Sequence, residues 1–158
     1  MVKVKNIIIW TMIAALVLLS GCGKENYPDL PDNAIAFRMS SFEDKEHDDE
    51  LMETIEYNGR IYAWYGGPNS KFKQTDIDKC IGYIIQDENV CSVPDIDNKD
   101  WKVYTLACDK DNNFLMDYID DGVDLMPPPK TFYRAIDTKE KDIEIPEYID
   151  NRGYDYWK

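Results

Sequence analysis

Residues 53–66 read "ETIEYNGRIYAWYG", and this stretch decides the fold class. Its centre, Asn58-Gly59, is the dipeptide that best tolerates positive φ at both central positions of a type I′ turn, the turn that matches the twist of paired strands. β-Branched and aromatic residues flank the dipeptide on both sides, and these residue types favour strands. We therefore predict a β-hairpin over residues 52–65.

Strand signals continue toward the C-terminus. Four further segments read as strands: 79–86 ("KCIGYIIQ"), 101–108 ("WKVYTLAC"), 113–119 ("NFLMDYI") and 131–137 ("TFYRAID"). Residues 109–112 have turn chemistry, and three prolines at 127–129 favour a polyproline II passage. No sustained helical apolar period appears after residue 22. The sequence thus predicts a mainly β domain over residues 34–158, folded as a small antiparallel barrel or sandwich.

The N-terminus has the three parts of an export signal. Lys3 and Lys5 give a positive start, Ile7 to Leu19 is apolar apart from one threonine, and two small residues then lead into Cys22. A membrane-spanning helix needs about 20 apolar residues to cross the hydrocarbon. The apolar run is shorter than that, so a removable signal over residues 1–21 is the better interpretation.

Leu19-Ser20-Gly21-Cys22 resembles the lipobox of bacterial lipoproteins. The resemblance implies that a diacylglyceryl group is attached to the Cys22 sulfur and that a peptidase then cuts before Cys22. It also implies acyl chains such as palmitate and a place on the extracytoplasmic face of the cell membrane. Two or more acyl chains are needed for stable anchoring. The lysine-rich basic set points to a Gram-positive source.

Removal of residues 1–21 changes the charge of the protein. The full chain has 18 basic and 31 acidic residues, and both lysines of the signal are lost, so the mature chain carries a net charge of −15. Residues 22–33 are polar and contain two prolines, which predicts a flexible, lipidated tether. An N-terminal strand paired into the domain is the alternative.

A second resemblance covers Tyr57 to Asp137. The series "CIGYII" (80–85), "VYTL" (103–106) and "FYRA" (132–135), with an asparagine-containing turn, is similar to small lipoproteins of Gram-positive bacteria with no assigned function. This likeness implies no catalytic residues and no ligand set.

Three cysteines remain in the mature domain, and an exported chain can form disulfides. If strands 79–86 and 101–108 are antiparallel neighbours, Cys80 lies near Cys108, which makes these two the candidate disulfide partners. Pairing Gln86 with Trp101 would place Cys80 opposite Ala107. Cys91 in the intervening loop is the rival partner, and three free thiols are the remaining alternative.

Metal and enzyme signals are weak. The segment 109–120 begins like a calcium loop but has Phe114 where a glycine is required, and the acidic run 43–50 around His47 is typical of a solvated loop. The chain has one histidine and neither a nucleophile-elbow motif nor a phosphate-binding glycine loop. We therefore expect no metal, no cofactor and no enzymatic activity; a hydrolase that uses paired carboxylates is the less favoured alternative.

A binding role is the remaining expectation. Alternation along the hairpin sends Tyr62 and Trp64 to one face and Tyr65 to the other, so Tyr62 and Trp64 are candidate ligand-facing aromatics, with burial in the core as the alternative. The acidic surface favours a cationic protein or peptide as partner and argues against nucleic acid. We expect a lipid-anchored binding or inhibitory module. A structural or accessory subunit of an envelope complex is the alternative, and a large apolar surface patch would indicate it.

Overall fold

The computed structural model describes residues 27–45, 50–85, 98–119 and 130–158. Over these ranges the chain forms β1 (Ile35–Arg38), β2 (Ser40–Asp44), β3 (Glu50–Tyr57), β4 (Arg60–Pro68), β5 (Ile77–Ile85), β6 (Trp101–Leu106), β7 (Phe114–Ile119), β8 (Lys130–Ala135) and β9 (Ile149–Asn151). Short 3-10 turns occur at Gln74–Asp76, Asn98–Asp100, Ile136–Thr138 and Asp155–Trp157. The mainly β fold class is confirmed. Within the described ranges, no helix has the length and apolar character needed to cross a bilayer.

The central hairpin forms as predicted. β3 and β4 pair antiparallel with Tyr57 opposite Arg60. Asn58 has φ 52° and Gly59 has φ 75°, so both turn residues occupy the left-handed region that a type I′ turn requires. The four other predicted strands correspond to β5, β6, β7 and β8. The sequence analysis did not identify β1, β2 and β9.

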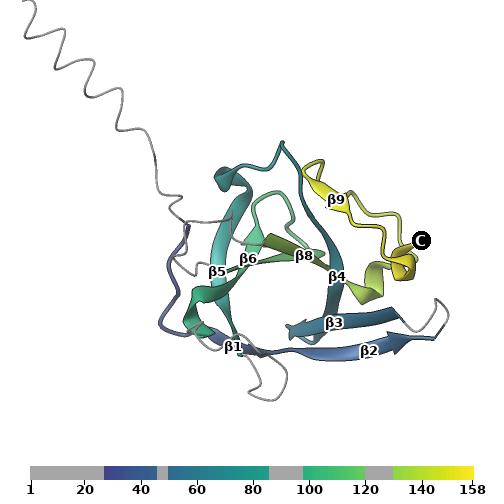
Figure 1. Ribbon diagram of the computed structural model, residues 1–158. Coiled ribbons are helices and arrows are strands. Elements are labelled where there is room, and N and C mark those ends of the chain that lie inside the picture. Colours follow the sequence, from purple (N-terminus) through teal and green to yellow (C-terminus); the bar gives the residue numbers. More distant parts are fainter. Residues whose placement is uncertain (1–26, 46–49, 86–97, 120–129) are drawn as a thin grey trace, which may run out of the picture.

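One sheet contains all nine described strands, and its two edge strands are consecutive in the chain. The order is β1-β5-β6-β7-β8-β4-β3-β2, with β9 paired to β4. Only Met39 separates β1 from β2, so the two edge strands belong to one continuous segment. The sheet must therefore curl until its two edges come together at that segment. In Figure 1, β1 and β2 run along the bottom of the view, with β5 on the left and β4 on the right. The result is a curled, barrel-like sheet.

β1 departs from the predicted antiparallel arrangement. It runs parallel to β5, with Ile35 opposite Gly82 and Phe37 opposite Ile84, so the sheet is mixed. Gly82 permits the close approach of the two strands, because a Cβ at this position would lie 2.0 Å from the Ile35 carbonyl oxygen. The other described pairs in the sheet are antiparallel.

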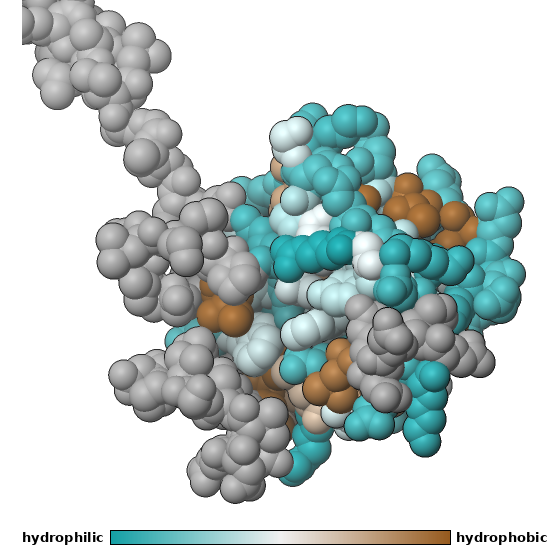
Figure 2. Space-filling view, turned by 45° about the vertical axis from the view of Figure 1, so that its right-hand side comes forward, coloured by the Kyte–Doolittle hydropathy of each residue, from teal (hydrophilic) through white to brown (hydrophobic). Residues whose placement is uncertain are grey.

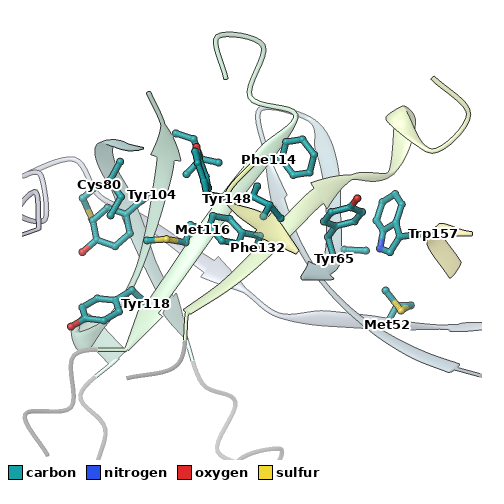
Figure 3. Packing of buried hydrophobic residues seen from close by; sticks show 14 of the residues in the cluster. Met52, Tyr65, Cys80, Tyr104, Phe114, Met116, Tyr118, Phe132, Tyr148 and Trp157 are labelled. Carbon is teal, nitrogen blue, oxygen red and sulfur yellow. The ribbon is translucent and has the colours of Figure 1, made fainter. Parts of the chain in front are cut away.

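Both faces of the sheet are buried. The inner cluster is formed by β-strand residues: Phe37, Ile55, Tyr62, Ile81, Ile84, Val103, Leu115, Tyr133 and Ala135. The ring centres of Phe37 on β1 and Tyr57 on β3 lie 6.2 Å apart. β1 is at one end of the strand order and β3 is next to the other end, so these rings can meet only because the face that carries them is concave. The outer cluster, shown in Figure 3, is covered by chain segments before β1 and after β8.

The segment before β1 is part of this cover. The Tyr27 ring lies 4.5 Å from the Tyr118 ring and 5.9 Å from the Tyr104 ring, and Lys130 Nζ lies 5.5 Å from the Tyr27 ring centre. Leu30 also packs against the outer cluster. Packed chain therefore begins within the range 22–33 that the sequence predicts as a tether. Residues 22–26 of that range lie outside the described residues.

The β1–β5 contact gives a first prediction. Gly82→Ala should lower the free energy of unfolding by about 1–3 kcal/mol, because the added methyl group must push β1 away from β5. Chemical denaturation measures this loss. The matched control is Gly67→Ala, where the new methyl group meets only the exposed side chain of Arg152, which can move. Equal losses for the two variants would contradict the proposed close packing at Gly82.

Candidate functional site

A buried carboxylate lies on the inner face of the sheet. Asp117 on β7 is 3% exposed, and its Oδ2 accepts hydrogen bonds from Trp101 Nε1 (3.0 Å) and the Tyr133 hydroxyl (2.9 Å). Its Oδ1 accepts a third hydrogen bond from the backbone N–H of Thr131 (3.0 Å). Burial raises the pKa of Asp117 to about 6, although the three donors act to lower it.

The environment of Asp117 indicates a structural role. Its three donors come from β6 and β8, the two neighbours of β7, so the carboxylate joins three adjacent strands. All of these donors belong to the protein, and a buried carboxylate surrounded in this way is stabilised without a ligand. Sequence analysis did not identify Asp117. The available signal was an aspartate inside the otherwise apolar run "FLMDYI".

The two predicted ligand-facing aromatics have different surroundings. Tyr62 is 1% exposed, belongs to the inner cluster, and donates a hydrogen bond to the Asn112 carbonyl oxygen (2.7 Å). The prediction is therefore wrong for Tyr62, because a ring inside the core cannot contact a ligand at the surface. Trp64 is half-buried, packs beside Tyr154 (6.4 Å between rings) and contacts both clusters. The predicted alternation is confirmed for Tyr62 and Tyr65, because Tyr65 packs in the outer cluster, on the opposite face from Tyr62.

The candidate disulfide does not form. Cys80 and Cys108 are both free thiols, one buried and one exposed. β5 and β6 are antiparallel neighbours as expected, but Cys80 lies opposite Tyr104 instead of Ala107. The strands pair in a different register from the predicted one, with Tyr83 opposite Lys102, and an irregularity between Cys80 and Gly82 shifts it by one further residue. Cys108 lies beyond the end of β6, where its sulfur is 3.1 Å from the Tyr148 hydroxyl. The rival partner Cys91 is outside the described residues, as are His47 and the lipid site Cys22.

An acidic groove opens beside the turn between β6 and β7. Its volume is about 460 Å³, and it is lined by Cys108, Asp109, Lys110, Asp111, Asn113, Asp142, Ile143, Glu144 and Pro146. Two separate segments, 108–113 and 142–146, thus bring four acidic residues and one lysine to the lining of one groove. The groove combines a negative charge with a hollow surface, and such a site favours positively charged side chains.

Arg60 holds one wall of this acidic groove in place. Its guanidinium donates to the carbonyl oxygens of Asp111 (2.9 Å) and Asn112 (3.0 Å), and to Asn113 Oδ1 (3.2 Å). The same group pairs with the Asp137 carboxylate at 2.8 Å, and this contact lowers the pKa of Asp137. Arg60 is the first residue of β4, so the central hairpin positions the acidic turn.

The segment 109–112 is the turn that the sequence predicts. The Asn112 N–H donates to the Asp109 carbonyl oxygen (3.2 Å), Asn112 has φ 49°, and Asp109 Oδ2 accepts from the Phe114 N–H. β7 begins at Phe114, the position where a calcium loop would need a glycine. Among the described residues, no three histidine, cysteine, aspartate or glutamate side chains are grouped closely enough to hold a metal ion.

Comparisons with known proteins add no identity. No family model, curated protein or solved structure matches this chain.

The raised pKa of Asp117 predicts an unusual pH dependence. A carboxyl group whose pKa is higher in the folded state stabilises the fold most in its protonated form, so its contribution falls as pH rises through about 6. We expect Asp117→Asn to remove this fall. The difference in unfolding free energy between variant and wild type should then shift by about 2–3 kcal/mol in favour of the variant between pH 4 and pH 7.

Asp137→Asn is the control of opposite sign. The lowered pKa of Asp137 gives stability that is present at neutral pH and lost on acidification, so this variant should become less stable relative to wild type as pH rises. Urea titrations of the three proteins at several pH values measure both trends. A difference between Asp117→Asn and wild type that does not change with pH would contradict the proposed burial of an ionisable group.

Proposed function

We propose that this protein is a lipid-anchored binding module on the extracytoplasmic face of the cell membrane, with a cationic protein or peptide as its partner. The observation that carries the proposal is the acidic groove, whose lining contains four acidic residues from two segments beside one lysine, Lys110. The net charge of −15 expected for the mature chain supports the same sign of partner and disfavours nucleic acid. Attachment to the membrane would occur through the lipid on Cys22.

The acidic groove can provide selectivity only through several contacts at once. A solvent-exposed ion pair contributes about 0–1 kcal/mol, so one lysine or arginine of a partner adds little. Asp109 and Asp111 from one segment and Asp142 and Glu144 from the other line the same hollow, so a basic side chain bound there can interact with more than one carboxylate. Binding of this kind gains mainly in association rate, and the rate falls as salt increases.

The packing of Tyr27 supports an action close to the membrane. Tyr27 is held against the rings of Tyr104 and Tyr118 and lies five residues after Cys22. Five residues span at most about 18 Å when fully extended. A lipid on Cys22 would therefore keep the domain near the bilayer, and a partner would meet it at the cell surface.

Less support exists for the two alternatives. An accessory subunit requires a continuous apolar patch, whereas the exposed large hydrophobic residues of the described chain are Ile35, Leu51, Ile61 and Ile145. Figure 2 shows apolar areas as separate small groups between hydrophilic ones on the face in view. A carboxylate hydrolase requires an acid with a raised pKa that can reach a substrate, and Asp117, whose pKa is raised to about 6 by burial, is enclosed by protein donors.

The binding role can be tested with an oligolysine peptide. Asp142 and Glu144 are both exposed, and the double variant Asp142→Asn/Glu144→Gln should weaken binding at low salt by about fivefold, because two carboxylates are removed from one hollow. The control is Asp32→Asn/Glu43→Gln, which changes the net charge equally at exposed positions outside the groove. Isothermal titration calorimetry gives both affinities. Equal weakening in the two variants would mean that only net charge attracts the peptide, and the groove would have no role.

Anchoring has its own test. Cys22→Ala should abolish lipid attachment, so the variant should leave the membrane fraction and should lack the lipid mass of the wild-type protein. Membrane fractionation and intact-mass spectrometry measure this. A variant that stays with the membranes and has no lipid mass difference from wild type would refute lipid anchoring at this residue.

A further inference from the structure

The curled sheet leaves a seam between β1 and β3. The β2–β3 ladder runs from Asp44 opposite Glu50 to Ser40 opposite Thr54, where the Thr54 hydroxyl also donates to the Ser40 carbonyl oxygen (3.2 Å). Beyond this point the described part of β1 pairs with β5, and residues 55–57 of β3 pair with β4. No described strand pairs with the two edges that face each other across the seam.

The seam is a groove, and part of its wall is apolar. Its volume is about 440 Å³, and it is lined by Ile35, Ala36, Phe37, Arg38, Ser40, Thr54, Ile55, Glu56, Asn58 and Ile61. Ile35 is 40% exposed and Ile61 is 51% exposed, so two of the exposed large hydrophobic residues of the described chain lie in one hollow. Exposed β-branched side chains beside unpaired strand edges are the features that a protein normally avoids on a free surface.

We propose that this seam binds an extended segment of a basic partner protein, which adds a strand between β1 and β3. A strand in this position would exchange main-chain hydrogen bonds with one or both edges. Its side chains on one face would contact Ile35, and those on the other face would contact Ile61. β1 has four residues, so the matching segment is about 13 Å long at the usual rise per residue.

The net charge of the chain favours a different, basic protein over a second copy of this chain as the occupant of the seam. Two mature chains, each with the net charge of −15 expected from the sequence, repel one another. A basic segment is attracted instead by the net charge of the chain. Within the seam, Glu56 is available to a lysine or arginine side chain, and Arg38, which also lines the seam, is available to a carboxylate of the same segment. The inference that the partner is basic rests on the proposed function, whereas the inference that it binds by adding a strand rests on the seam alone.

The test uses a lysine–valine peptide with two adjacent valines, one for each face of the strand, and amide signals of the isotopically labelled protein are recorded by NMR. We expect the amides of Ala36, Arg38 and Glu56 to shift on binding. The same peptide with N-methyl groups on alternate amides should bind at least about tenfold more weakly, because it loses the main-chain donors of one strand edge. A change of the valines to serine should weaken binding in the same direction.

Protein variants separate the apolar wall from general hydrophobicity. Ile35→Ala/Ile61→Ala should weaken binding about tenfold, since it removes apolar surface from the groove. Leu51→Ala/Ile145→Ala is the matched control, because both residues are exposed and lie outside the seam, and it should bind as wild type does. Equal effects of the two double variants, or no effect of N-methylation, would overturn strand addition.

The remaining outcomes distinguish this inference from the proposed function. Shifts confined to residues 109–113 and 142–144 would overturn the seam and leave the acidic groove as the binding site. A glutamate–valine peptide that binds the seam as tightly as the lysine peptide would support strand addition and overturn the cationic partner. If the free wild-type protein is a dimer and the Ile35→Ala/Ile61→Ala variant is a monomer, the seam is occupied by a second copy of the chain. That result would overturn the proposal.

Discussion

The structure depends on one covalent constraint, the continuity of β1 and β2 across Met39. These two strands are the edges of the sheet, and they belong to the same segment, so the sheet must bend through its whole width. The bend creates a concave face on which Phe37 of β1 reaches Tyr57 of β3. The seam lies where this segment passes from one edge to the other, since the described part of β1 pairs with β5 and β2 pairs with β3.

The polar groups of the concave face follow from this geometry. Asp117 lies where three strands meet on the inner face, and its two oxygens satisfy an indole N–H, a hydroxyl and a backbone N–H. Tyr62 and Arg60 come from the start of β4 and bind the turn between β6 and β7 through carbonyl oxygens. The central hairpin thus fixes the position of the acidic turn, and the acidic groove is a consequence of the same curl.

Local chemistry explains which elements could be predicted from sequence. Asn58-Gly59 identifies its hairpin because few dipeptides tolerate positive φ twice, and β5 to β8 show apolar, β-branched or aromatic runs. β2 reads "SSFED" and β9 has three residues, so neither carries an apolar pattern of its own. The Cys80–Cys108 pairing failed because β5 and β6 pair in a different register from the predicted one and a bulge next to Cys80 shifts it further, and neither leaves a clear sequence signal. Asp117 was missed because its burial depends on how β6, β7 and β8 pair and on which face of β7 is covered, which the local sequence does not show.

The seam is the most specific feature of this account, and cross-strand nuclear Overhauser effects test it most directly. The account predicts contacts typical of parallel strands between β1 and β5, antiparallel contacts between β2 and β3 up to Ser40 and Thr54, and no ladder contacts between residues 35–38 and 55–57. A continuous antiparallel ladder from β2 into β1 along the whole of β3 would contradict it, because the sheet would then be closed and would offer no edge to a partner.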